Sequence, residues 1–225
     1  MTKPFVRLFL VRHGEAVANT EMRYLGRQDD PLTDLGRWQA AKLAEALAPL
    51  PITAIYSSPL QRAVDTASSI ACGCGLTVTL DERLTEGSFG AWEGLTRAEV
   101  LGRGEADVAV LRLWESDPSS APAGGESFAA IQLRVVDCVE SLADRHAGES
   151  IALVSHVGPI KTLICAAMGA PLSVVHRMFL DPATISVVDW GNSTESSAPP
   201  AVLRLFNAHH HLGWDAAKWL KPHPR

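Results

Sequence analysis

The stretch VRLFLVRHGE, residues 6–15, decides the fold of this chain. It is an apolar run broken only by one arginine near its start, and it ends in a turn at Gly14. Such a run is typical of a strand covered on both faces, and ligands of open α/β sheets bind beyond the carboxyl ends of such strands. We therefore expect Arg12 and His13 at the edge of a ligand site. A guanidinium offers a planar fork of donors to phosphate oxygens, and a neighbouring imidazole can attack or move a proton near neutral pH, so the pair indicates phosphoryl chemistry.

Further along the chain, apolar runs of strand length alternate with longer amphipathic segments. This alternation is a βαβ signature and predicts an α/β fold. Strands are expected over residues 6–11, 52–56, 76–80, 150–155, 184–190 and 201–206, with the last two completing the sheet at an edge. Helices are expected over residues 35–47, 60–72, 106–114, from about 128 to 145, and 160–168. Ser57, Ser58 and Pro59 are expected to supply the cap and first turn of the second helix.

Length and composition favour one domain that spans residues 1–225. An apolar content of 47% in 225 residues can bury one substantial core. No linker, charge block or repeat divides the chain, and the irregular stretch 116–126 is short enough to be a loop between helices. The net charge of -5 and the lack of a continuous stripe of lysines and arginines argue against nucleic acid and suit a small anionic substrate.

The chain shows no signal for export or membrane insertion. The N-terminal apolar stretch is too short for a signal peptide, and no run reaches membrane-spanning length, so we expect a cytoplasmic protein without a membrane partner. Its four cysteines form no pair of CxxC motifs and are expected to be free thiols; they are Cys72, Cys74, Cys138 and Cys165. The edge strand and the apolar C-terminal tail are compatible with a homodimer. Trp214 and Trp219 are expected to dock that tail on the core or on a partner subunit.

Polar side chains follow predicted strands in several separate segments. Arg62 falls in the first turn of a helix that follows a strand, as Arg12 follows another strand. Glu86 lies in a glycine-rich loop, and His156 stands between a strand and a helix N-terminus, where backbone N–H groups favour anions. Because these positions share one end of the sheet, we expect the side chains to converge with His13.

Four motifs resemble those of the histidine phosphatase superfamily, also called the phosphoglycerate mutase-like family. They are VRHGE (residues 11–15), SSPLQRAVDTA (57–67), LTEGSFGAWEG (84–94) and VSHVGPIK (154–161), and the segment 8–40 resembles the family signature as a whole. The resemblance covers most of the chain. It implies a three-layer α/β/α sandwich with a mostly parallel central sheet.

The resemblance also implies a mechanism. His13 would attack phosphorus and form a phosphohistidine, which water then releases, with no cofactor and no metal. Arg12, Arg62 and His156 would surround the transferred group, and Glu86 would protonate the leaving alcohol and later activate water. The same resemblance assigns phosphate or substrate binding to Asn19, Leu25, Gly26 and Val157. The chain would then be a metal-independent phosphomonoesterase of the histidine acid phosphatase-like type, acting on a small phosphorylated metabolite.

Some features depart from the commoner family pattern. The stretch GSFGAWEG leads quickly into an acidic, apolar helix where mutases of the family carry a longer basic insertion, which favours a phosphatase. The segment VSHVGPIK looks more like the version found in α-ribazole phosphatase-like and acid phosphatase-like members. Leu25 stands where many broad-specificity members have glutamine, so Tyr24, Arg23 or Arg27 would replace that donor. We hypothesise that one of the two arginines selects a second anionic group, such as a carboxylate.

Other interpretations stay open at this point. The chain could transfer the phosphoryl group as a mutase does, or bind a phosphorylated ligand without catalysis. A metal-dependent hydrolase could use the run His209 to His211, but adjacent side chains on an extended chain point to opposite faces and do not easily converge on one ion. Glu15, Glu82 and Glu93 are alternative carboxylates near the motifs, and Asn19 could simply cap a turn.

Overall fold

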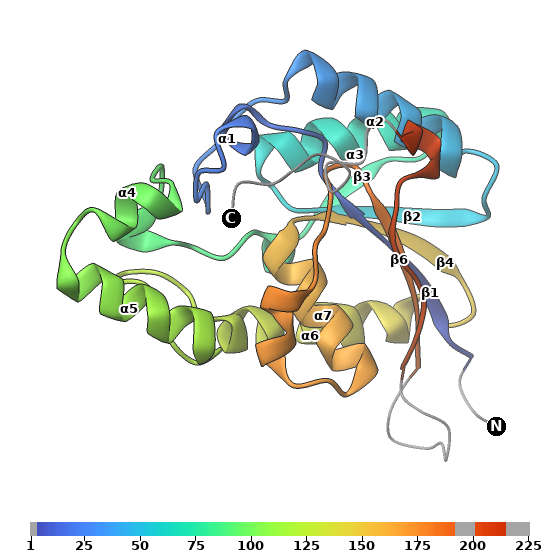
Figure 1. Cartoon of the computed structure of the whole chain (residues 1–225). Coiled ribbons are helices and arrows are strands. Elements are labelled where there is room, and N and C mark those ends of the chain that lie inside the picture. The colour runs from blue at the N-terminus through green and yellow to red at the C-terminus, as the bar shows by residue number, and fades with distance from the viewer. Residues whose placement is uncertain (1–3, 192–200, 215–225) are drawn as a thin grey trace.

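A six-stranded sheet lies between two layers of helices in the computed structural model, which describes residues 4–191 and 201–214 (Figure 1). The strand order is β3-β2-β4-β1-β5-β6. Strands β1 to β4 pair in parallel, whereas β5 runs antiparallel to both β1 and β6. The strands are β1 (Val6–Arg12), β2 (Ile52–Ser57), β3 (Val78–Leu80), β4 (Ser150–Ser155), β5 (Ile185–Trp190) and β6 (Ala201–Ala208). The expected three-layer sandwich with a mostly parallel sheet is confirmed.

Two pairs of helices cover the two faces of the sheet (Figure 1). Helices α2 (Asp34–Leu47) and α3 (Gln61–Cys74) pack on one face, and α6 (Phe128–Arg145) and α7 (Val157–Met168) pack on the other. The remaining helices are α1 (Val17–Thr20), α4 (Arg97–Leu101), α5 (Glu105–Ser116) and the 3-10 turns η1 (Glu82–Leu84), η2 (Gly90–Trp92), η3 (Leu172–Arg177) and η4 (His210–Leu212).

Strand β1 shows why its sequence is apolar on both sides. Leu8 and Leu10 pack into the core with α6 and α7, whereas Phe9 and Val11 pack into the core with α2 and α3. Successive side chains of a strand point to opposite faces, so a central strand between two helical layers needs apolar residues at nearly every position. The exception is Arg7, whose guanidinium bonds both carboxylate oxygens of Asp189 on the neighbouring β5 at 2.7 and 3.0 Å.

A third group of buried residues lies away from the sheet, under α4 and α5. It contains Trp92, Val100, Leu111 and Trp114, with Tyr24 packed against it. Figure 1 shows these two helices projecting beside the sandwich. The segment that the sequence predicted as loops and short helices therefore builds a small core of its own.

The start of α3 differs from the expectation. The helix begins at Gln61, and the cap comes from Asp29 in a distant loop, whose Oδ1 accepts from the Gln61 N–H at 2.8 Å. Ser57 is still part of β2, and Ser58 Oγ accepts from the Leu60 N–H at 3.3 Å. Strand β3 is also shorter than predicted. The long-range cap has no local sequence signal, which is why the prediction missed it.

The strand register sets the geometry of the site. In the parallel pairing Arg12 of β1 lies beside Ser155 of β4, and Ser57 of β2 lies beside Val154. The residues that follow these strands therefore leave the sheet next to one another. They are His13, Ser58 and His156.

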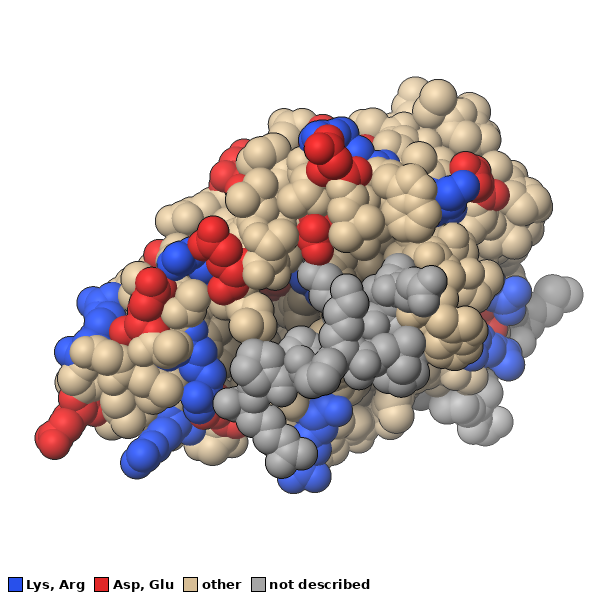
Figure 2. All heavy atoms as spheres, turned by 45° about the horizontal axis from the view of Figure 1, so that its top comes forward, with Lys and Arg blue, Asp and Glu red and all other residues tan. Residues whose placement is uncertain are grey.

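Several further expectations concern the cysteines, the surface charge and the C-terminal tryptophans. The four cysteines are free, with two of them buried, as expected. On the face drawn in Figure 2, basic and acidic side chains alternate in small groups and form no continuous basic stripe. None of the helices in the described ranges is long and apolar enough to span a membrane. Trp214 is largely exposed, while Trp219 lies outside the described residues.

The turn after β1 touches the start of α2 through two glycines. A Cβ on Gly14 would lie 2.5 Å from the Gly36 carbonyl oxygen, and a Cβ on Gly36 would overlap the Glu15 carbonyl oxygen. Backbone oxygens cannot move aside as a flexible side chain can. The close approach of α2 therefore fixes the position of the loop that carries His13.

We expect Gly36→Ala to lower the free energy of unfolding by about 1–3 kcal/mol, because the added methyl group forces the turn after β1 and the start of α2 apart. Thermal and urea denaturation measure this. Gly102→Ala is the matched control, since its Cβ would lie 3.4 Å from the nearest oxygen, that of Glu99. The control should change stability by less than about 0.5 kcal/mol. Equal stabilities of the two variants would contradict the steric argument.

Candidate active site

A cavity of about 270 Å³ opens at the carboxyl edge of β1, β2 and β4. It brings together eight of the residues that the sequence singled out. These are Arg12, His13, Asn19, Leu25, Gly26, Arg62, Glu86 and Val157. The ninth, His156, lies directly behind His13, with 5.0 Å between the ring centroids. The predicted convergence of segments that are far apart in the chain is therefore what the structure shows.

His13 is held in one tautomer by its own loop. Its ring is buried, and Nδ1 lies 2.7 Å from the carbonyl oxygen of Gly14. Because a carbonyl only accepts hydrogen bonds, Nδ1 carries the proton and Nε2 keeps its lone pair. Burial, and then the positive charges of Arg12 and Arg62, hold the pKa of His13 well below its usual 6.5. The imidazole is thus neutral and nucleophilic at Nε2.

His156 is oriented by a serine that the sequence reading placed only in a helix cap. Ser58 Oγ lies 2.8 Å from His156 Nε2, and both residues are fully buried. Nδ1 of His156 is also buried and has no hydrogen-bond partner. Burial, and then the neighbouring His13 and Arg62, hold the pKa of His156 well below 6.5. If Ser58 donates to Nε2, the neutral ring presents an N–H at Nδ1 for a ligand.

Two arginines are anchored by backbone carbonyls and not by carboxylates. Arg62, which is 1% exposed, donates to the carbonyl oxygens of Gln28 and Gly26 at 2.8 Å each. Arg12 donates to the carbonyl oxygen of Leu180 at 2.5 Å. The Nε atoms of both guanidinium groups are buried without a partner. Burying such donors costs free energy unless a ligand supplies the missing hydrogen-bond acceptors.

The charges of these residues repel one another. Burial lowers the pKa of Arg12 to about 10, with Arg62 adding to the effect, and burial also lowers the pKa of Arg62. Carboxylates such as Glu86 oppose these shifts only in part. A multiply charged anion would relieve the repulsion and pair the free donors. The site is therefore preorganised for a group such as a phosphate.

Glu86 is placed by two backbone amides. Its Oε1 accepts from the N–H of Gly87 at 2.8 Å and from the N–H of Gly158, in the first turn of α7, at 3.1 Å. A Cβ on Gly158 would lie 2.4 Å from Glu86 Oε1, so a larger residue there would displace this carboxyl group. The carboxyl group lines the cavity beside the arginines. Of the acidic residues near the motifs, it is the one in position to exchange a proton with a ligand there.

Of the other carboxylates near the motifs, two accept hydrogen bonds within the protein and one is exposed. Glu15 is buried and accepts from the Thr33 hydroxyl at 3.1 Å. Glu82 is exposed in η1. Glu93 Oε1 accepts from Arg27 N, Ser88 Oγ and Phe89 N at 3.1 to 3.2 Å, which ties the loop after α1 to the loop after Glu86.

Asn19 and Gly26 shape the near wall of the cavity. Asn19 Oδ1 accepts from the Ala16 N–H at 2.9 Å, so the expected turn cap is present, and the amide nitrogen is the atom that could donate to a ligand. Gly26 has φ of +58°, and a Cβ there would overlap the Glu93 carboxylate. Leu25 lines the same wall. This left-handed turn directs the Gly26 carbonyl oxygen at Arg62.

The opposite end of the cavity is aromatic and was not predicted from the sequence. Trp114 stacks on Phe128, with 5.2 Å between ring centroids, and His176 meets both rings edge-on. Lys161 of α7 also lines the cavity. The quoted motif contained Lys161, but nothing in the local pattern indicated that α5, the start of α6 and η3 would complete this wall of the cavity.

The two arginines hypothesised to select a second anion are both engaged by acidic residues. Arg23 lines the cavity and pairs with Glu21 at 2.5 Å and Glu99 at 2.8 Å. Arg27 pairs with Glu126 at 3.2 Å and lines a neighbouring depression next to Arg83 and Arg134. The arrangement therefore favours a different residue for that role.

The histidine run at the end of the described chain supports the backbone behind His13. His211 Nε2 lies 2.9 Å from the carbonyl oxygen of Ala183, and the Ala183 N–H donates to the His13 carbonyl oxygen at 3.0 Å. His210 is exposed. Within residues 4–191 and 201–214, no group of three or more histidines, cysteines and acidic residues is arranged to hold a metal ion.

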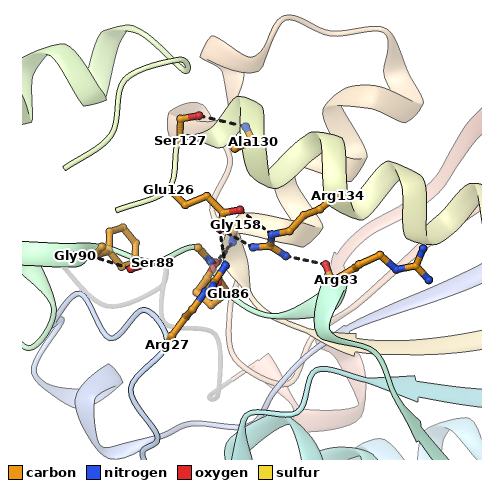
Figure 3. Close-up of polar contacts among 12 residues, drawn as sticks. Arg27, Arg83, Glu86, Ser88, Gly90, Glu126, Ser127, Ala130, Arg134 and Gly158 are labelled. Atoms are coloured by element: carbon orange, nitrogen blue, oxygen red, sulfur yellow. Dashed lines mark hydrogen bonds and ion pairs between the residues drawn. The ribbon is translucent and has the colours of Figure 1, made fainter. Parts of the chain in front are cut away.

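A shared carboxylate orients two arginines that hold the backbone at Glu86 and at Arg83 before it (Figure 3). Glu126 accepts from Arg134 Nε and Nη2 at 2.9 and 3.0 Å and from Arg27 Nη2 at 3.2 Å. Arg27 Nε then donates to the Glu86 carbonyl oxygen at 3.3 Å, and Arg134 Nη1 donates to the Arg83 carbonyl oxygen at 2.7 Å. Glu126 thus orients two arginines that hold the loop of Glu86.

Comparison with known proteins identifies relatives of the chain. The model of the histidine phosphatase superfamily (branch 1) matches residues 8–198. A bifunctional protein of Mycobacterium tuberculosis is 40% identical over 207 residues, which are 92% of this chain but 55% of that protein. The chain thus spans about half the length of this relative.

Two solved structures are similar to this chain in both fold and sequence. A mycobacterial glucosyl-3-phosphoglycerate phosphatase in complex with VO3 is 33% identical with a TM-score of 0.80, covering 90% of this chain and 99% of that one. A phosphoserine phosphatase from Entamoeba histolytica in complex with 3-phosphoglyceric acid is 30% identical with a TM-score of 0.80, covering 92% of this chain and 99% of that one. The similarity extends over nearly the whole of each structure.

We expect Glu126→Gln to lower kcat of any reaction at this site by about 10- to 100-fold, because a small displacement of a reacting group has effects of that size. KM should change less than kcat, since the phosphate end of the cavity keeps its donors. Steady-state kinetics at saturating and subsaturating substrate separate the two parameters.

Glu149→Gln is the matched control for this substitution. Glu149 also holds two side chains, His146 and Thr53, but it precedes β4 at the opposite end of the sheet. The control should change kcat by less than about 2-fold, since ion pairs away from a site contribute little. An equal loss in both variants would show that Glu126 acts through general stability.

Proposed function

The chain belongs to branch 1 of the histidine phosphatase superfamily, and from that premise we propose that it hydrolyses small phosphomonoesters through a phosphohistidine on His13. The cavity volume of about 270 Å³ suits a small phosphorylated metabolite. The phosphatases among its structural relatives support the hydrolytic reaction. The proposed reaction uses no metal ion, because arginines supply the charge that the phosphoryl group needs.

One observation carries the proposal. Three buried nitrogens, Arg12 Nε, Arg62 Nε and His156 Nδ1, have no partner among the described residues; the two arginines line the same cavity as His13, and the ring of His156 lies against that of His13. A tetrahedral phosphoryl group placed against His13 would give each of them an oxygen. In the transition state the phosphoryl oxygens carry the charge, so these donors would lower the barrier.

The proposed reaction has two steps. In the first, the lone pair of His13 Nε2 forms a bond to phosphorus and the bond from phosphorus to the ester oxygen breaks, while Glu86, protonated in the complex with substrate, gives its proton to that oxygen. In the second, Glu86 takes a proton from water, the water oxygen bonds to phosphorus, and the N–P bond breaks. Inorganic phosphate leaves, and His13 and Glu86 return to their starting protonation states.

We expect His13→Ala to reduce hydrolysis of para-nitrophenyl phosphate by about 10³-fold or more, as loss of a nucleophile does in other enzymes. The native protein, quenched during turnover, should carry an acid-labile phosphoryl group that the variant lacks. Activity should persist in a strong chelator. Full activity of His13→Ala, or activity that a chelator abolishes, would overturn the proposed mechanism.

His210→Ala serves as the matched control for that variant. It removes an exposed histidine from the C-terminal run, and hydrolysis should stay within about 2-fold of the native rate. A loss of activity in this variant, restored by added metal, would favour a metal-dependent reaction at the histidine run.

The pKa of His13 sets the acid limit of the reaction. The nucleophile is active only when neutral, and its pKa lies well below 6.5, so protonation inactivates it only at lower pH. We therefore expect kcat/KM for para-nitrophenyl phosphate to hold steady from pH about 7.5 down to about 6, since this parameter reports ionisation of the free enzyme. An acid limb centred at pH 6.5 or above would show that His13 is not perturbed in this way.

A further inference from the structure

The cavity contains a cation that the proposed reaction does not use. Lys161 lies in α7 three residues after Gly158 and four after Val157, on the face of the helix that lines the cavity. Its side chain is half-buried. The ammonium group makes no hydrogen bond or ion pair with any residue that the structure describes.

The other cations of the cavity are neutralised or anchored by the protein itself. Arg23 pairs with two carboxylates, and Arg12 and Arg62 donate to backbone carbonyls. An ammonium withdrawn from water without a partner is costly, and proteins usually pair it. Burial, together with the charge of Arg12, lowers the pKa of Lys161 to about 8. The group therefore still carries its charge at neutral pH.

The electrostatic neighbours of Lys161 place it between the two ends of the cavity. Arg12 and Glu86, at the phosphoryl end, both act on its charge. Burial lowers the pKa of His176, which stands against Trp114 at the aromatic end, and the charge of Lys161 adds to this effect. A phosphomonoester with its phosphorus at His13 would extend its leaving group past Glu86 toward this lysine.

We propose that Lys161 binds a carboxylate on the leaving group, so that the cavity selects phosphomonoesters that carry a second acidic group. This inference rests on the proposed function, because the position of the leaving group follows from attack by His13. The ammonium donates charge-assisted hydrogen bonds to the carboxylate oxygens, and the walls formed by Trp114 and Phe128 limit competition from water. Lys161 thus takes the role that the sequence hypothesis gave to Arg23 or Arg27.

The test compares two ligands that differ at the carboxylate alone. In glycerol 3-phosphate a hydroxymethyl group replaces the carboxylate of 3-phosphoglycerate on the same carbon skeleton. At about pH 7 an amine with a pKa of about 8 is charged, and the preference of the native protein is measured there as KM for each ligand that it hydrolyses, or as Kd by isothermal calorimetry if it hydrolyses neither. We expect 3-phosphoglycerate to bind about 10-fold more tightly or better, the size of a charged hydrogen bond.

Three variants make the result specific to this ammonium group. Lys161→Met keeps the length of the side chain and should reduce the preference to within about 2-fold, whereas Lys161→Arg should retain most of it. Lys42→Met removes a surface lysine that pairs with Glu45 and should leave the preference unchanged. Thermal denaturation shows whether Lys161→Met is folded, and Lys161→Arg provides the test if it is not.

The possible outcomes separate this inference from the proposed function. A native protein without preference, or one that binds neither ligand, overturns the role of Lys161, as does a Lys161→Met variant that keeps the preference. Hydrolysis of para-nitrophenyl phosphate, measured in parallel, needs no carboxylate. If the native protein hydrolyses it without preferring 3-phosphoglycerate, the function stands and the inference fails. If it prefers 3-phosphoglycerate but hydrolyses neither ester, the proposed function fails and the carboxylate site stands.

Discussion

The buried guanidinium groups of Arg12 and Arg62 impose the constraint on which the rest of the structure depends. A charge removed from water must be surrounded by oxygen atoms, yet a carboxylate partner would neutralise it and repel a phosphate. Backbone carbonyls meet both needs, because they accept hydrogen bonds without adding a negative charge. The loop after α1 must therefore lie against α3 to deliver the carbonyl of Gly26, and Leu180 must approach β1 from the far side of the sheet.

Three acidic residues hold the loops around the cavity and do not contact Arg12 or Arg62 directly. Asp29 caps α3, Glu93 joins two loops, and Glu126 orients the pair of arginines beside Glu86. None of the three bonds directly to Arg12 or Arg62, so the charge that faces the ligand is not cancelled at close range. This separation explains how a chain with a net charge of -5 presents a cationic pocket: the negative charges hold the loops, and the positive charges face inward.

The sequence predicted the layers of this fold because periodicity reports burial on each face, and strands such as β4 and helices such as α6 follow it closely. It also predicted that Arg12, His13, Arg62, Glu86 and His156 converge, since four of them follow a strand or open a helix at one sheet edge and Glu86 lies in a glycine-rich loop that resembles a family motif. Contacts between remote segments had no such signal. The cap from Asp29, the serine behind His156 and the aromatic wall opposite Lys161 depend on loop paths. Those paths follow from many weak interactions and not from any local pattern.

The projecting helices α4 and α5 add a different consequence. They carry their own small core within the long connection from β3 to β4 and form no part of the sheet, so a change in their sequence acts first on this core and not on the turn that holds His13. Trp114, at the aromatic end of the cavity, comes from this segment. A change in this segment would therefore alter the aromatic end of the cavity and leave His13 and the buried arginines in place. Ligand recognition and the reacting groups thus depend on separate parts of the fold, and each part can change without the other.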